Sequence, residues 1–503
     1  MAIALSAGHH VKRIRRFWVT SGAGSDYMAK IVFVQRLWYE YPGVGILSAC
    51  LKQSGHSVDV AIGEEISQFG GVFEGADIIA FSVMTGFQGW ALSLGRQLKE
   101  KYNSYIIFGG PHPTYFPEIV NEDGVDVICR GEGEGALLDL AERLDMNEGF
   151  TDIPNLWVKH NGDIFKNGLR ALVEDLDDLP FPDREIYYDK YSFIGKNSHR
   201  AFMAGRGCPY GCSFCFNVQL KQMYKDKGKY VRMRSPGSVL KEIKSVNGKY
   251  PTEKIFFHDD TFVLNHKWLR EFLGMYTEQI RLPFFCQARA DTFTEELIKD
   301  LRMAGCQSVF FAIESGDETI RRKVLNKPIS NEKIIKSARW LKENGIKIST
   351  YNMLGIPGER VEQALKTVEL NIVIKADYPR CSFLTPYPGT RIAELAREQN
   401  SMSKDADFEI NANSQQSEMF MATTEGRELK NLHSLFQTAI LFPWTYPLVK
   451  RLIRLPLGLV FRLWWAVIYF LVFTRSEGRS MKVMLIFALR NFRVSVWETK
   501  KKA

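Results

Sequence analysis

Residues 204–217 read AGRGCPYGCSFCFN, and three of the eight cysteines of the chain, Cys208, Cys212 and Cys215, lie in this stretch. A structural zinc site uses four ligands, usually as two pairs on separate turns, and no fourth partner stands out nearby. A disulfide uses two thiols and leaves one over. An iron–sulfur cube normally takes four thiolates, one for each iron, so three thiolates leave one iron open to a small chelating molecule.

The sequence around this stretch alternates between apolar runs and helical segments. The runs between residues 196 and 400 that we expect to be strands are 200–206, 254–260, 283–289, 308–315, 347–355 and 380–387. Their alternation with helices predicts parallel strands, and six of them suggest a partial (β/α)6 barrel rather than a closed eightfold barrel. Barrel chemistry sits at the carboxyl ends of strands, and Cys208 lies just past the first one.

A second alternating region precedes the barrel, at residues 29–150. It opens with KIVFV at 30–34, a continuous apolar run typical of a strand buried on both faces. Strands and helices then alternate, which predicts a doubly wound, Rossmann-like α/β sheet that binds ligands at the carboxyl ends of its strands. The candidate ligand contacts among the turn residues there are Gly43, Gly45, Ser82, Thr85, Gly109, Gly110 and Glu132.

Three further segments complete the expected organisation. Residues 1–28 are a basic leader, either a short disordered arm or an upstream start that adds nothing. Residues 151–195 combine a hairpin that turns at Asn161-Gly162 with an acidic, proline-broken linker. Residues 401–503 contain the polar stretch NANSQQSE at 411–418 and then a basic, aromatic region that we expect to be mostly helical.

The net charge of +9 is concentrated at one end of the chain. Residues 440–503 hold twelve Lys and Arg against two Glu, whereas the other 439 residues sum to −1. A neutral body argues against a nucleic-acid enzyme, and the basic tail indicates contact with something anionic. No secretory signal is recognisable, and we expect the five scattered cysteines to be buried and reduced in the cytoplasm.

The cysteine stretch resembles the radical S-adenosylmethionine (SAM) superfamily. The spacing Cys208-x-x-x-Cys212-x-x-Cys215, with Phe214 before the last cysteine and a strand before the first, is that family's pattern. The resemblance implies that the three thiolates hold a [4Fe-4S] cluster whose open iron is chelated by the amino and carboxylate groups of SAM. One electron from the cluster then splits SAM into methionine and a 5′-deoxyadenosyl radical, so a reducing electron-donor protein is an expected partner.

Several strand ends resemble the superfamily less specifically. The segments AIESG (312–316) and LGIPGE (354–359) stand where the family contacts SAM, whereas FHDDTF (257–262) departs from its glycine-glycine-glutamate motif, so Asp259 or Asp260 takes that place. The SAM contacts that the resemblance implies are Phe214, Asp259, Arg289, Glu314, Ser315 and Gly355. For each carboxylate the alternative is a helix cap or a salt bridge within the barrel.

The amino-terminal sheet resembles the cobalamin-binding domain that precedes the barrel in one large class of radical SAM proteins. SVMTG (82–86), GGPHPT (109–114) and RGEGE (130–134) are typical of that class. The Asp-x-His-x-x-Gly loop of other cobalamin proteins is replaced by RLWYEYPGVG (36–45), so we expect no histidine below the cobalt. A nucleotide-binding domain of another kind is the alternative.

Together the resemblances imply an enzyme in which cobalamin delivers a methyl group to an unactivated carbon, as in class B radical SAM methyltransferases. The first rival is an oxidative cyclase or rearrangement enzyme of the same architecture, which transfers no methyl group. A cobalamin sensor with a vestigial barrel is a further alternative, against which the intact cysteine spacing argues. A tRNA methylthiotransferase would need additional cluster cysteines in its front domain.

The apolar segment at residues 455–473 bears on the substrate. It is just long enough to span a bilayer, but Arg462 near its middle makes a span costly. Apolar and aromatic residues mixed with basic ones suit helices that lie in a headgroup layer. We therefore expect peripheral association with the anionic inner face of the membrane and a lipid or isoprenoid substrate; a membrane span and a soluble helical cap on the barrel are the alternatives.

Overall fold

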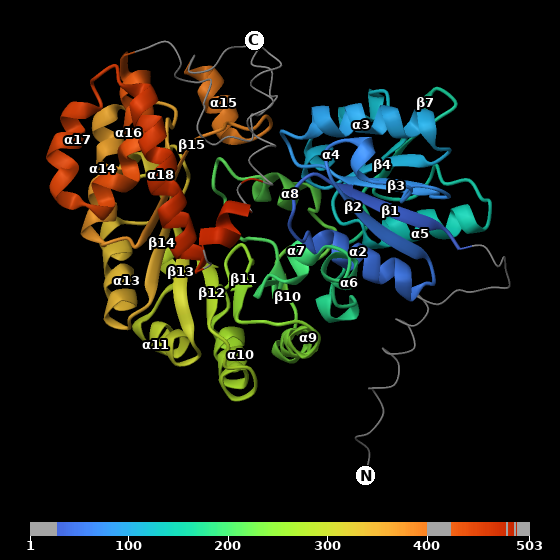
Figure 1. The fold of residues 1–503 in the computed structure, drawn as a ribbon, viewed down its shortest axis with the longest axis horizontal. Coiled ribbons are helices and arrows are strands. Elements are labelled where there is room, and N and C mark those ends of the chain that lie inside the picture. The colour runs from blue at the N-terminus through green and yellow to red at the C-terminus, as the bar shows by residue number, and fades with distance from the viewer. Residues whose placement is uncertain (1–27, 400–423, 479–480, 487–488, 490–503) are drawn as a thin grey trace. The chain divides into compact units, whose positions relative to one another are not determined.

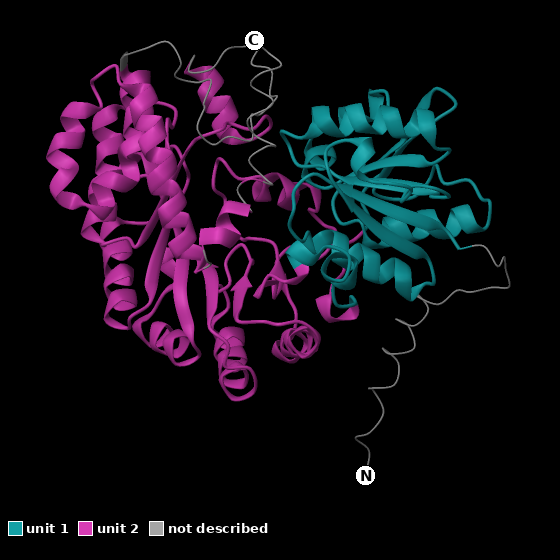
Figure 2. Ribbon diagram, viewed as in Figure 1, with its two compact units in different colours: residues 1–170, 179–194 teal, residues 171–178, 195–503 magenta. Residues whose placement is uncertain are grey.

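The computed structural model describes residues 28–399, 424–478, 481–486 and 489. The basic leader up to residue 27, the polar stretch at 411–418 and the last part of the basic tail, 490–503, lie outside the described residues. Contacts within the chain define two compact units, which Figure 2 colours separately. Unit 1 consists of residues 1–170 and 179–194, and unit 2 of residues 171–178 and 195–503.

Unit 1 is built on a seven-stranded sheet in the order β2-β1-β3-β4-β5-β6-β7 (Figure 1). Its strands are β1 (Lys30–Gln35), β2 (Ser57–Ile62), β3 (Ile78–Ser82), β4 (Tyr105–Gly109), β5 (Val127–Cys129), β6 (Leu156–His160) and β7 (Asp163–Lys166). Its helices are α2 (Pro42–Gln53), α3 (Gln88–Lys101), α4 (Pro111–Tyr115), α5 (Glu134–Asp145) and α6 (Glu185–Tyr188), with short 3-10 turns η1 (Ile66–Gln68) and η2 (Pro117–Asn121).

The parallel part of this sheet confirms the predicted α/β architecture. β1 to β5 pair in parallel, and β1 is buried from Ile31 to Gln35, as expected for a strand covered on both faces. The strand order changes direction between β1 and β3, so the connections leave those two strands toward opposite faces. Such a switch point opens a crevice at the carboxyl ends of the strands, where open α/β sheets bind their ligands.

The hairpin of β6 and β7 belongs to this sheet. It turns at Asn161 and Gly162, whose φ angles of 52° and 87° match the positive values that a two-residue hairpin turn requires. β6 then pairs antiparallel with β5. The sequence analysis predicted the hairpin as part of the connector at 151–195, and the structure instead uses it to cover the otherwise unpaired edge of β5.

Unit 2 confirms the predicted six-stranded partial barrel. All its neighbouring strands are parallel, in the order β15-β14-β13-β12-β11-β8. They are β8 (His199–Phe202), β11 (Lys254–Phe257), β12 (Phe284–Ala288), β13 (Cys306–Glu314), β14 (Lys347–Leu354) and β15 (Tyr378–Phe383), and a small ribbon pairs β9 (Gly205–Arg206) with β10 (Arg232–Met233).

Helices connect these strands and extend past the last one. They are α8 (Asn217–Met223), α9 (Pro236–Lys249), α10 (His266–Gln279), α11 (Glu295–Met303), α12 (Glu318–Lys323), α13 (Asn331–Glu343), α14 (Val361–Val373), α15 (Arg391–Glu398), α16 (Thr424–Leu441), α17 (Tyr446–Leu452) and α18 (Gly458–Glu477). Shorter elements are α7 (Ser192–Gly195), η3 (Leu176–Asp178), η4 (Ala290–Thr292) and η6 (Pro443–Thr445).

Side-chain caps mark where the barrel helices begin. Ser235, Asn265, Thr294 and Ser330 each stand one residue before a helix and accept a hydrogen bond from the backbone N–H three residues further on. Each cap satisfies a donor that the first helical turn leaves free, which contributes about 1 kcal/mol to helix stability. The polar residue between each strand and its helix therefore specifies the strand-to-helix turn locally.

The sheet of unit 2 has two differently covered faces. Phe257 and Phe284 pack against Tyr276 of α10, on the face that the connecting helices cover. Phe310 and Tyr351 contact each other, and Arg380 lies over both of their rings as well as over Phe473 of α18. The carboxyl-terminal part of α18 therefore covers aromatic side chains of the sheet, in addition to packing against α16 and β15.

Candidate functional site

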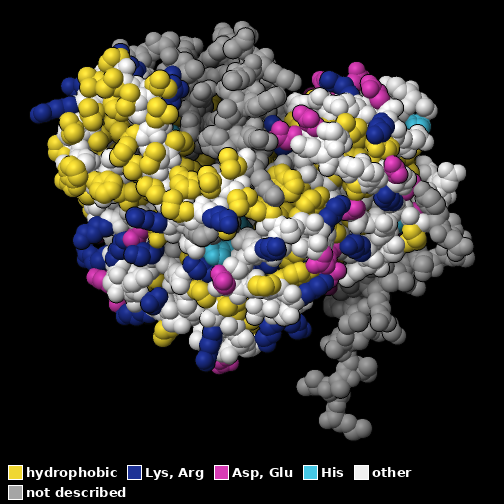
Figure 3. Space-filling model, in the orientation of Figure 1, with side chains coloured by type: hydrophobic (Ala, Val, Ile, Leu, Met, Phe, Trp, Pro, Cys, Tyr) yellow, Lys and Arg dark blue, Asp and Glu magenta, His cyan; other side chains and the backbone are white. Residues whose placement is uncertain are grey.

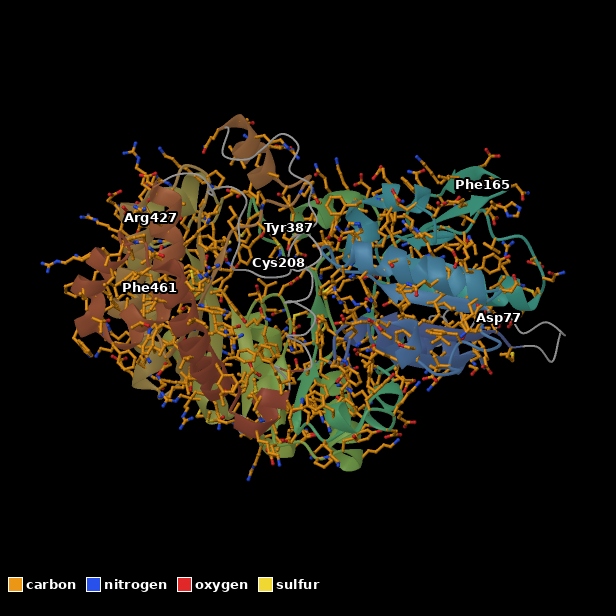
Figure 4. All side chains as sticks on the ribbon, turned by 45° about the horizontal axis from the view of Figure 1, so that its top comes forward. Asp77, Phe165, Cys208, Tyr387, Arg427 and Phe461 are labelled. Atoms are coloured by element: carbon orange, nitrogen blue, oxygen red, sulfur yellow. The ribbon has the colours of Figure 1, made fainter. Side chains whose placement is uncertain are left out.

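The three-cysteine loop lies between the end of β8 and the start of α8. The backbone N–H of Cys215 donates to the carbonyl of Cys212 at 3.1 Å, and the backbone N–H of Val218 donates to the carbonyl of Cys215 at 3.4 Å. Figure 4 labels Cys208 and also Tyr387, whose ring contacts that of Phe216 at 5.2 Å between centroids. The loop thus sits at the carboxyl end of the first barrel strand, as the sequence predicted.

A distant segment anchors this loop. Ser213 donates from its backbone N–H to the carbonyl of Leu325 at 3.0 Å and from its hydroxyl to the carbonyl of Val324 at 2.6 Å. The Asn326 amide donates to the carbonyl of Gly211 at 2.6 Å. Phe214 packs against an apolar cluster that contains Leu325. These contacts join residues more than a hundred positions apart and restrict the positions available to the thiols.

Asp259 fixes the backbone just before the loop. Its carboxylate accepts hydrogen bonds from the N–H groups of Ala204 at 3.1 Å and Gly205 at 2.6 Å, and the side chain is buried. Burial raises the pKa of Asp259 to about 7, although these backbone donors lower it. The carboxylate of Asp259 is therefore already hydrogen-bonded to the backbone that follows β8. The side chain of Asp260, in contrast, is exposed and accepts a hydrogen bond from the Asn217 amide at 3.2 Å.

Arg289 lies beside the second cysteine. Its guanidinium binds both carboxylate oxygens of Asp291, at 3.0 and 3.1 Å, and stacks over the ring of Tyr210 at 3.6 Å from the centroid. One nitrogen lies 3.8 Å from the sulfur of Cys212. The fork of Arg289 is thus held in place by Asp291 and presents positive charge to a thiol of the loop.

Glu314 and Lys327 form a buried ion pair next to the same thiol. The Lys327 ammonium lies 3.0 Å from the Glu314 carboxylate and donates to the carbonyl of Ala312 at 2.7 Å. Burial raises the pKa of the Cys212 thiol, whereas the charges of Lys327 and Arg289 lower it. Because Glu314 adopts φ 67°, a conformation that costs a non-glycine residue energy, this ion pair also holds a strained backbone at the end of β13.

A buried arginine fixes the backbone position of Ser315. The Arg321 guanidinium donates to the carbonyls of Ser315 and Ile329 and to the side chain of Asn331. The hydroxyl of Ser315 accepts from the backbone N–H of Asp317 at 3.3 Å. The predicted contact residue therefore belongs to a loop whose backbone is held by a fully buried cation.

Gly355 turns the chain at the end of β14. Its φ is 72°, which favours glycine, and its N–H donates to the Glu359 carboxylate at 2.8 Å. Ile356 donates to the same oxygen at 3.4 Å, and burial raises the pKa of Glu359 to about 8. The other carboxylate oxygen of Glu359 is buried without a hydrogen-bond partner among the described residues. At neutral pH Glu359 is therefore mostly protonated.

The three thiols lie on one loop that follows the first barrel strand. Among the described residues, no group of three His, Cys, Asp or Glu side chains gathers closely enough to hold one metal ion. Burial raises the pKa of both the Cys208 and the Cys212 thiol, and the charge of Cys215 raises them further, so the three sulfurs interact. In an iron–sulfur cube each thiolate binds a different iron, so the three sulfurs must be near one another without sharing one metal ion.

The candidate cobalamin residues of unit 1 lie at the carboxyl ends of its parallel strands. Ser82 ends β3, Gly109 ends β4, and Gly43 and Gly45 lie in the first turn of α2. Hydrogen bonds join the loops that follow these strands: the N–H of Val83 donates to the carbonyl of Gly109 at 2.8 Å. The loops therefore form one connected edge.

Thr85, Gly110 and Glu132 complete this edge. The Thr85 hydroxyl lies 3.3 Å from Nδ1 of the buried His112, and the carbonyl of Gly110 accepts from the Thr114 hydroxyl at 2.7 Å. Burial lowers the pKa of His112 to about 4, so this imidazole is neutral at physiological pH. The carbonyl of Glu132 accepts from the amide of Asn155 at 3.0 Å.

The glycines of this edge differ in how much room surrounds them. A Cβ on Gly110, whose φ is 92°, would meet the backbone of Val83 at 3.3 Å, and one on Gly45 would meet Pro182 at 3.1 Å. Close packing within the protein is thus enough to explain why glycine stands at both of these positions. A Cβ on Gly43 would meet nothing within 4 Å, and one on Gly109 would meet nothing closer than 3.9 Å. Gly43 and Gly109 therefore leave space that a ligand can occupy.

The sequence reasoning missed the residues that hold the predicted ones in place. Lys327, Arg321, Tyr210 and Asn155 contact predicted site residues or their loops, and no motif contained them as candidates. Asn155 gave a weak signal, since a buried asparagine before a strand tends to bind neighbouring backbone. Lys327 and Arg321 are brought to the site only by tertiary folding, whereas Tyr210 lies within the cysteine stretch itself, between Cys208 and Cys212.

Comparison with known proteins agrees with both units. Residues 203–370 match the family model of the radical SAM superfamily, and residues 38–141 match that of the B12 binding domain. An uncharacterized methyltransferase of Pyrococcus horikoshii is 29% identical over 326 residues, which are 64% of this chain and 69% of that protein. The anaerobic magnesium-protoporphyrin IX monomethyl ester cyclase of Rubrivivax gelatinosus is 25% identical over 329 residues, 62% of this chain and 57% of the cyclase.

A solved structure shares the fold over almost the whole chain. The cobalamin-dependent S-adenosylmethionine radical enzyme OxsB, with aqua-cobalamin and SAM bound, superposes with a TM-score of 0.67 at 15% identity, over 98% of this chain and 85% of that one. The chain is a radical SAM protein with a B12-binding domain in front of the barrel. Its cofactors are a [4Fe-4S] cluster, SAM and cobalamin.

We predict that Glu359→Gln makes stability less dependent on pH. The folded chain holds a proton on Glu359 between pH 4.5, the ordinary pKa, and about 8, whereas the unfolded chain does not. The wild type should therefore lose about 1.4 kcal/mol of stability per pH unit as the pH rises through this window. Glutamine keeps an oxygen acceptor for Gly355 and cannot titrate, so thermal unfolding of the variant should fall less steeply with pH.

The exposed Glu362→Gln provides the matched control, because it removes a carboxyl from the same segment without burial. Its melting temperature should follow that of the wild type across the same pH range. If the curves for Glu359→Gln and wild type run parallel, Glu359 does not carry a buried proton.

We predict that Gly109→Ala lowers cobalamin retention without unfolding the protein. A Cβ there finds ordinary contacts, at 3.9 Å from Cβ of Cys129 and 4.0 Å from the carbonyl of Phe81, but it narrows the approach to the end of β4. Cobalt per chain after purification with added cobalamin should fall about fivefold or more, while the melting temperature of the cofactor-free protein stays within about 2 °C.

Gly149→Ala is the matched control for this change, because a Cβ there meets nothing within 4 Å and Gly149 lies beyond α5. It should keep the cobalt content of the wild type. Equal cobalt in Gly109→Ala and wild type would place the ligand elsewhere.

Proposed function

We propose that this chain is a cobalamin-dependent radical SAM C-methyltransferase that methylates an unactivated carbon of a lipid-like or other hydrophobic metabolite. The observation that carries the proposal is the combination, in one chain, of three interacting thiols at the mouth of a parallel barrel with a sheet of the B12-binding type. When bound, the cluster supplies the electron that cleaves SAM, and cobalamin supplies a transferable methyl group.

The residues of unit 2 divide between binding and positioning. We assign Cys208, Cys212 and Cys215 to the cluster, because their thiols lie on one anchored loop. Arg289 and Lys327 put positive charge beside Cys212, which favours its thiolate and eases addition of an electron to the cluster. Because Asp291 and Glu314 already hold these two cations in place, the side chains around a bound cluster would need to move little when it accepts an electron.

The SAM contacts are assigned from the same geometry. Glu314, Ser315 and Gly355 lie at the carboxyl ends of β13 and β14, and Phe214 packs beside the cysteine loop. For the SAM amine we propose Asp260 rather than Asp259, because the carboxylate of Asp259 is already committed to the backbone of Ala204 and Gly205. Asp259 then acts as a positioning residue.

In unit 1 we assign Gly43, Gly45, Ser82, Thr85, Gly109, Gly110 and Glu132 to the cobalamin-binding edge. The loop after β1 reads RLWYEY at residues 36–41 and supplies no histidine. That loop would therefore offer a bound cobalamin no imidazole ligand. The supporting observation for methyl transfer is the similarity to the Pyrococcus methyltransferase, whose matched region covers 69% of that protein.

A second candidate function is oxidative cyclisation without methyl transfer. The similarity to the Rubrivivax cyclase favours it, since the match covers 62% of this chain. Both reactions need the same cluster, SAM and cobalamin sites. Only the products separate them, because methyl transfer converts one SAM to S-adenosylhomocysteine and cyclisation does not.

The hydrophobic substrate and a cytoplasmic, membrane-peripheral location are part of the proposal. Helix α18 is apolar around most of its circumference and has a mean hydropathy of 1.4 over its most apolar window. Among the described residues, it is the one helix that is long and apolar enough to cross a membrane by length and composition. An enzyme that works at the bilayer surface has direct access to lipid-like substrates.

We predict that Cys212→Ala loses the cluster. After anaerobic purification with iron, the wild type should contain about four irons per chain and release 5′-deoxyadenosine from SAM under a low-potential reductant. The variant should retain less than about half of the iron and release none. Cys50→Ala, which changes a buried cysteine of unit 1, should match the wild type; iron loss in both variants would point to unfolding instead.

We predict that the methyl group of SAM reaches cobalamin. With methyl-labelled SAM and a low-potential reductant that brings the cobalt to the Co(I) state, the wild type holding cobalamin should produce labelled methylcobalamin and an equal amount of S-adenosylhomocysteine. With a total lipid extract added, label should enter the organic phase together with stoichiometric 5′-deoxyadenosine. Release of 5′-deoxyadenosine with no labelled cobalamin and no S-adenosylhomocysteine would favour the cyclase and overturn methyl transfer.

A further inference from the structure

Helix α18 is apolar on two opposite faces, and within the described part of the chain one of them is covered by other elements while the other is exposed. On the inner face Phe461, Ile468 and Val472 are buried, and Trp465 and Tyr469 stack with centroids 4.7 Å apart. The same helix packs against α16 and β15. A helix on the surface of a soluble unit normally carries polar residues on its outer face.

The outer face of α18 breaks that rule. Figure 3 shows apolar side chains gathered over the region of α17 and α18. The α17–α18 surface is defined by six apolar side chains that are each more than half exposed: Trp444, Leu448, Leu459, Val460, Leu463 and Val467. On α18, Leu459, Leu463 and Val467 are four residues apart and so form a stripe along the helix. A contiguous exposed patch of this kind marks an interaction site.

The charges around this surface are almost all positive. Between residues 442 and 486 the exposed basic side chains of the described chain are Lys450, Arg451, Arg454, Arg462, Arg475 and Lys482. The acidic residue of this segment is Glu477, which lies 3.2 Å from Arg380 and is thereby engaged on the inner side. The exposed Glu369 of α14 also lies beside α17, where it accepts a hydrogen bond from the Tyr446 hydroxyl at 2.8 Å. Among the described residues of segment 442–486, exposed basic side chains therefore accompany the apolar ones and outnumber the acidic ones.

We propose that the α17–α18 surface docks on an anionic lipid bilayer, with the outer face of α18 in the headgroup layer. Basic residues mixed with exposed Leu and Trp are the features of helices that bind in the plane of such a layer. Trp444, 80% exposed in the turn before α17, is of the type that anchors at the membrane interface. The proposal deepens the proposed function by assigning the surface through which a hydrophobic substrate is reached.

Two other arrangements fit the contacts less well. A span would surround α18 with lipid, yet its inner face is packed against α16 and its carboxyl end is tied by Arg380 to Ser476 and Glu477. A twofold pairing of two copies through this surface would bring two sets of mostly basic side chains together, because the described part of segment 442–486 has six exposed basic side chains and one acidic residue, Glu477. An anionic bilayer removes that conflict.

The test is co-sedimentation of the full chain, purified with its cofactors, with phosphatidylcholine vesicles prepared with and without phosphatidylglycerol. We expect binding only to the anionic vesicles and weakening as salt is raised. Leu463→Glu/Val467→Glu and Arg451→Glu/Arg454→Glu should each lower the partition coefficient about tenfold or more. The matched controls change equally exposed residues elsewhere: Met146→Glu/Met303→Glu and Arg302→Glu/Arg339→Glu should stay within about twofold of the wild type.

Iron and cobalt content and light scattering are measured on every variant, which separates docking from folding and from chemistry. Unchanged metal content with lost vesicle binding supports the proposal, whether or not methyl transfer is found. The proposal is overturned by a wild type that ignores anionic vesicles, or by controls that lose binding as much as the surface variants do. It is also overturned by a wild-type dimer that Leu463→Glu/Val467→Glu converts to monomer, which would make a second copy the occupant.

Discussion

The anchoring of the cysteine loop is the constraint on which the rest of unit 2 depends. Three thiols serve one cluster only if their separations are fixed before the cluster forms, because a flexible loop would lose much of the binding energy to ordering. The buried carboxylate of Asp259 holds the start of the loop through Ala204 and Gly205, and residues 324–326 hold its middle. Both anchors come from other strands and loops of the barrel, so the fold itself sets the geometry of the thiols.

Two ion pairs lie beside this loop. Lys327 neutralises Glu314, and Arg289 is held by Asp291, while both cations face the sulfur of Cys212. A buried ion pair seldom adds much stability, since desolvation offsets its Coulomb energy. Its value here is positional: charges fixed in a site of low polarity act strongly on whatever forms there, and they need no reorganisation.

The carboxyl-terminal helices connect this chemistry to the surface of the molecule. The last part of α18 reaches the aromatic face of the sheet through Arg380 and Phe473, whereas its first part exposes Leu459 and Leu463. One helix is thus continuous from the floor of the barrel strands to the exposed apolar surface. Arg380 in turn lies over the rings of Phe310 and Tyr351.

Much of the architecture was determined by the sequence alone, because its signals are local. Continuous apolar runs marked the parallel strands, their alternation with helical segments indicated the α/β class, and the cysteine stretch fell just past a predicted strand. The pairing of β6 with β5, the commitment of Asp259 to backbone, and the arrival of Lys327 beside Cys212 depended on contacts between distant residues. Those contacts leave no periodic or spacing signal, since a buried pair is specified by shape and charge in three dimensions, and so only the tertiary structure decided them.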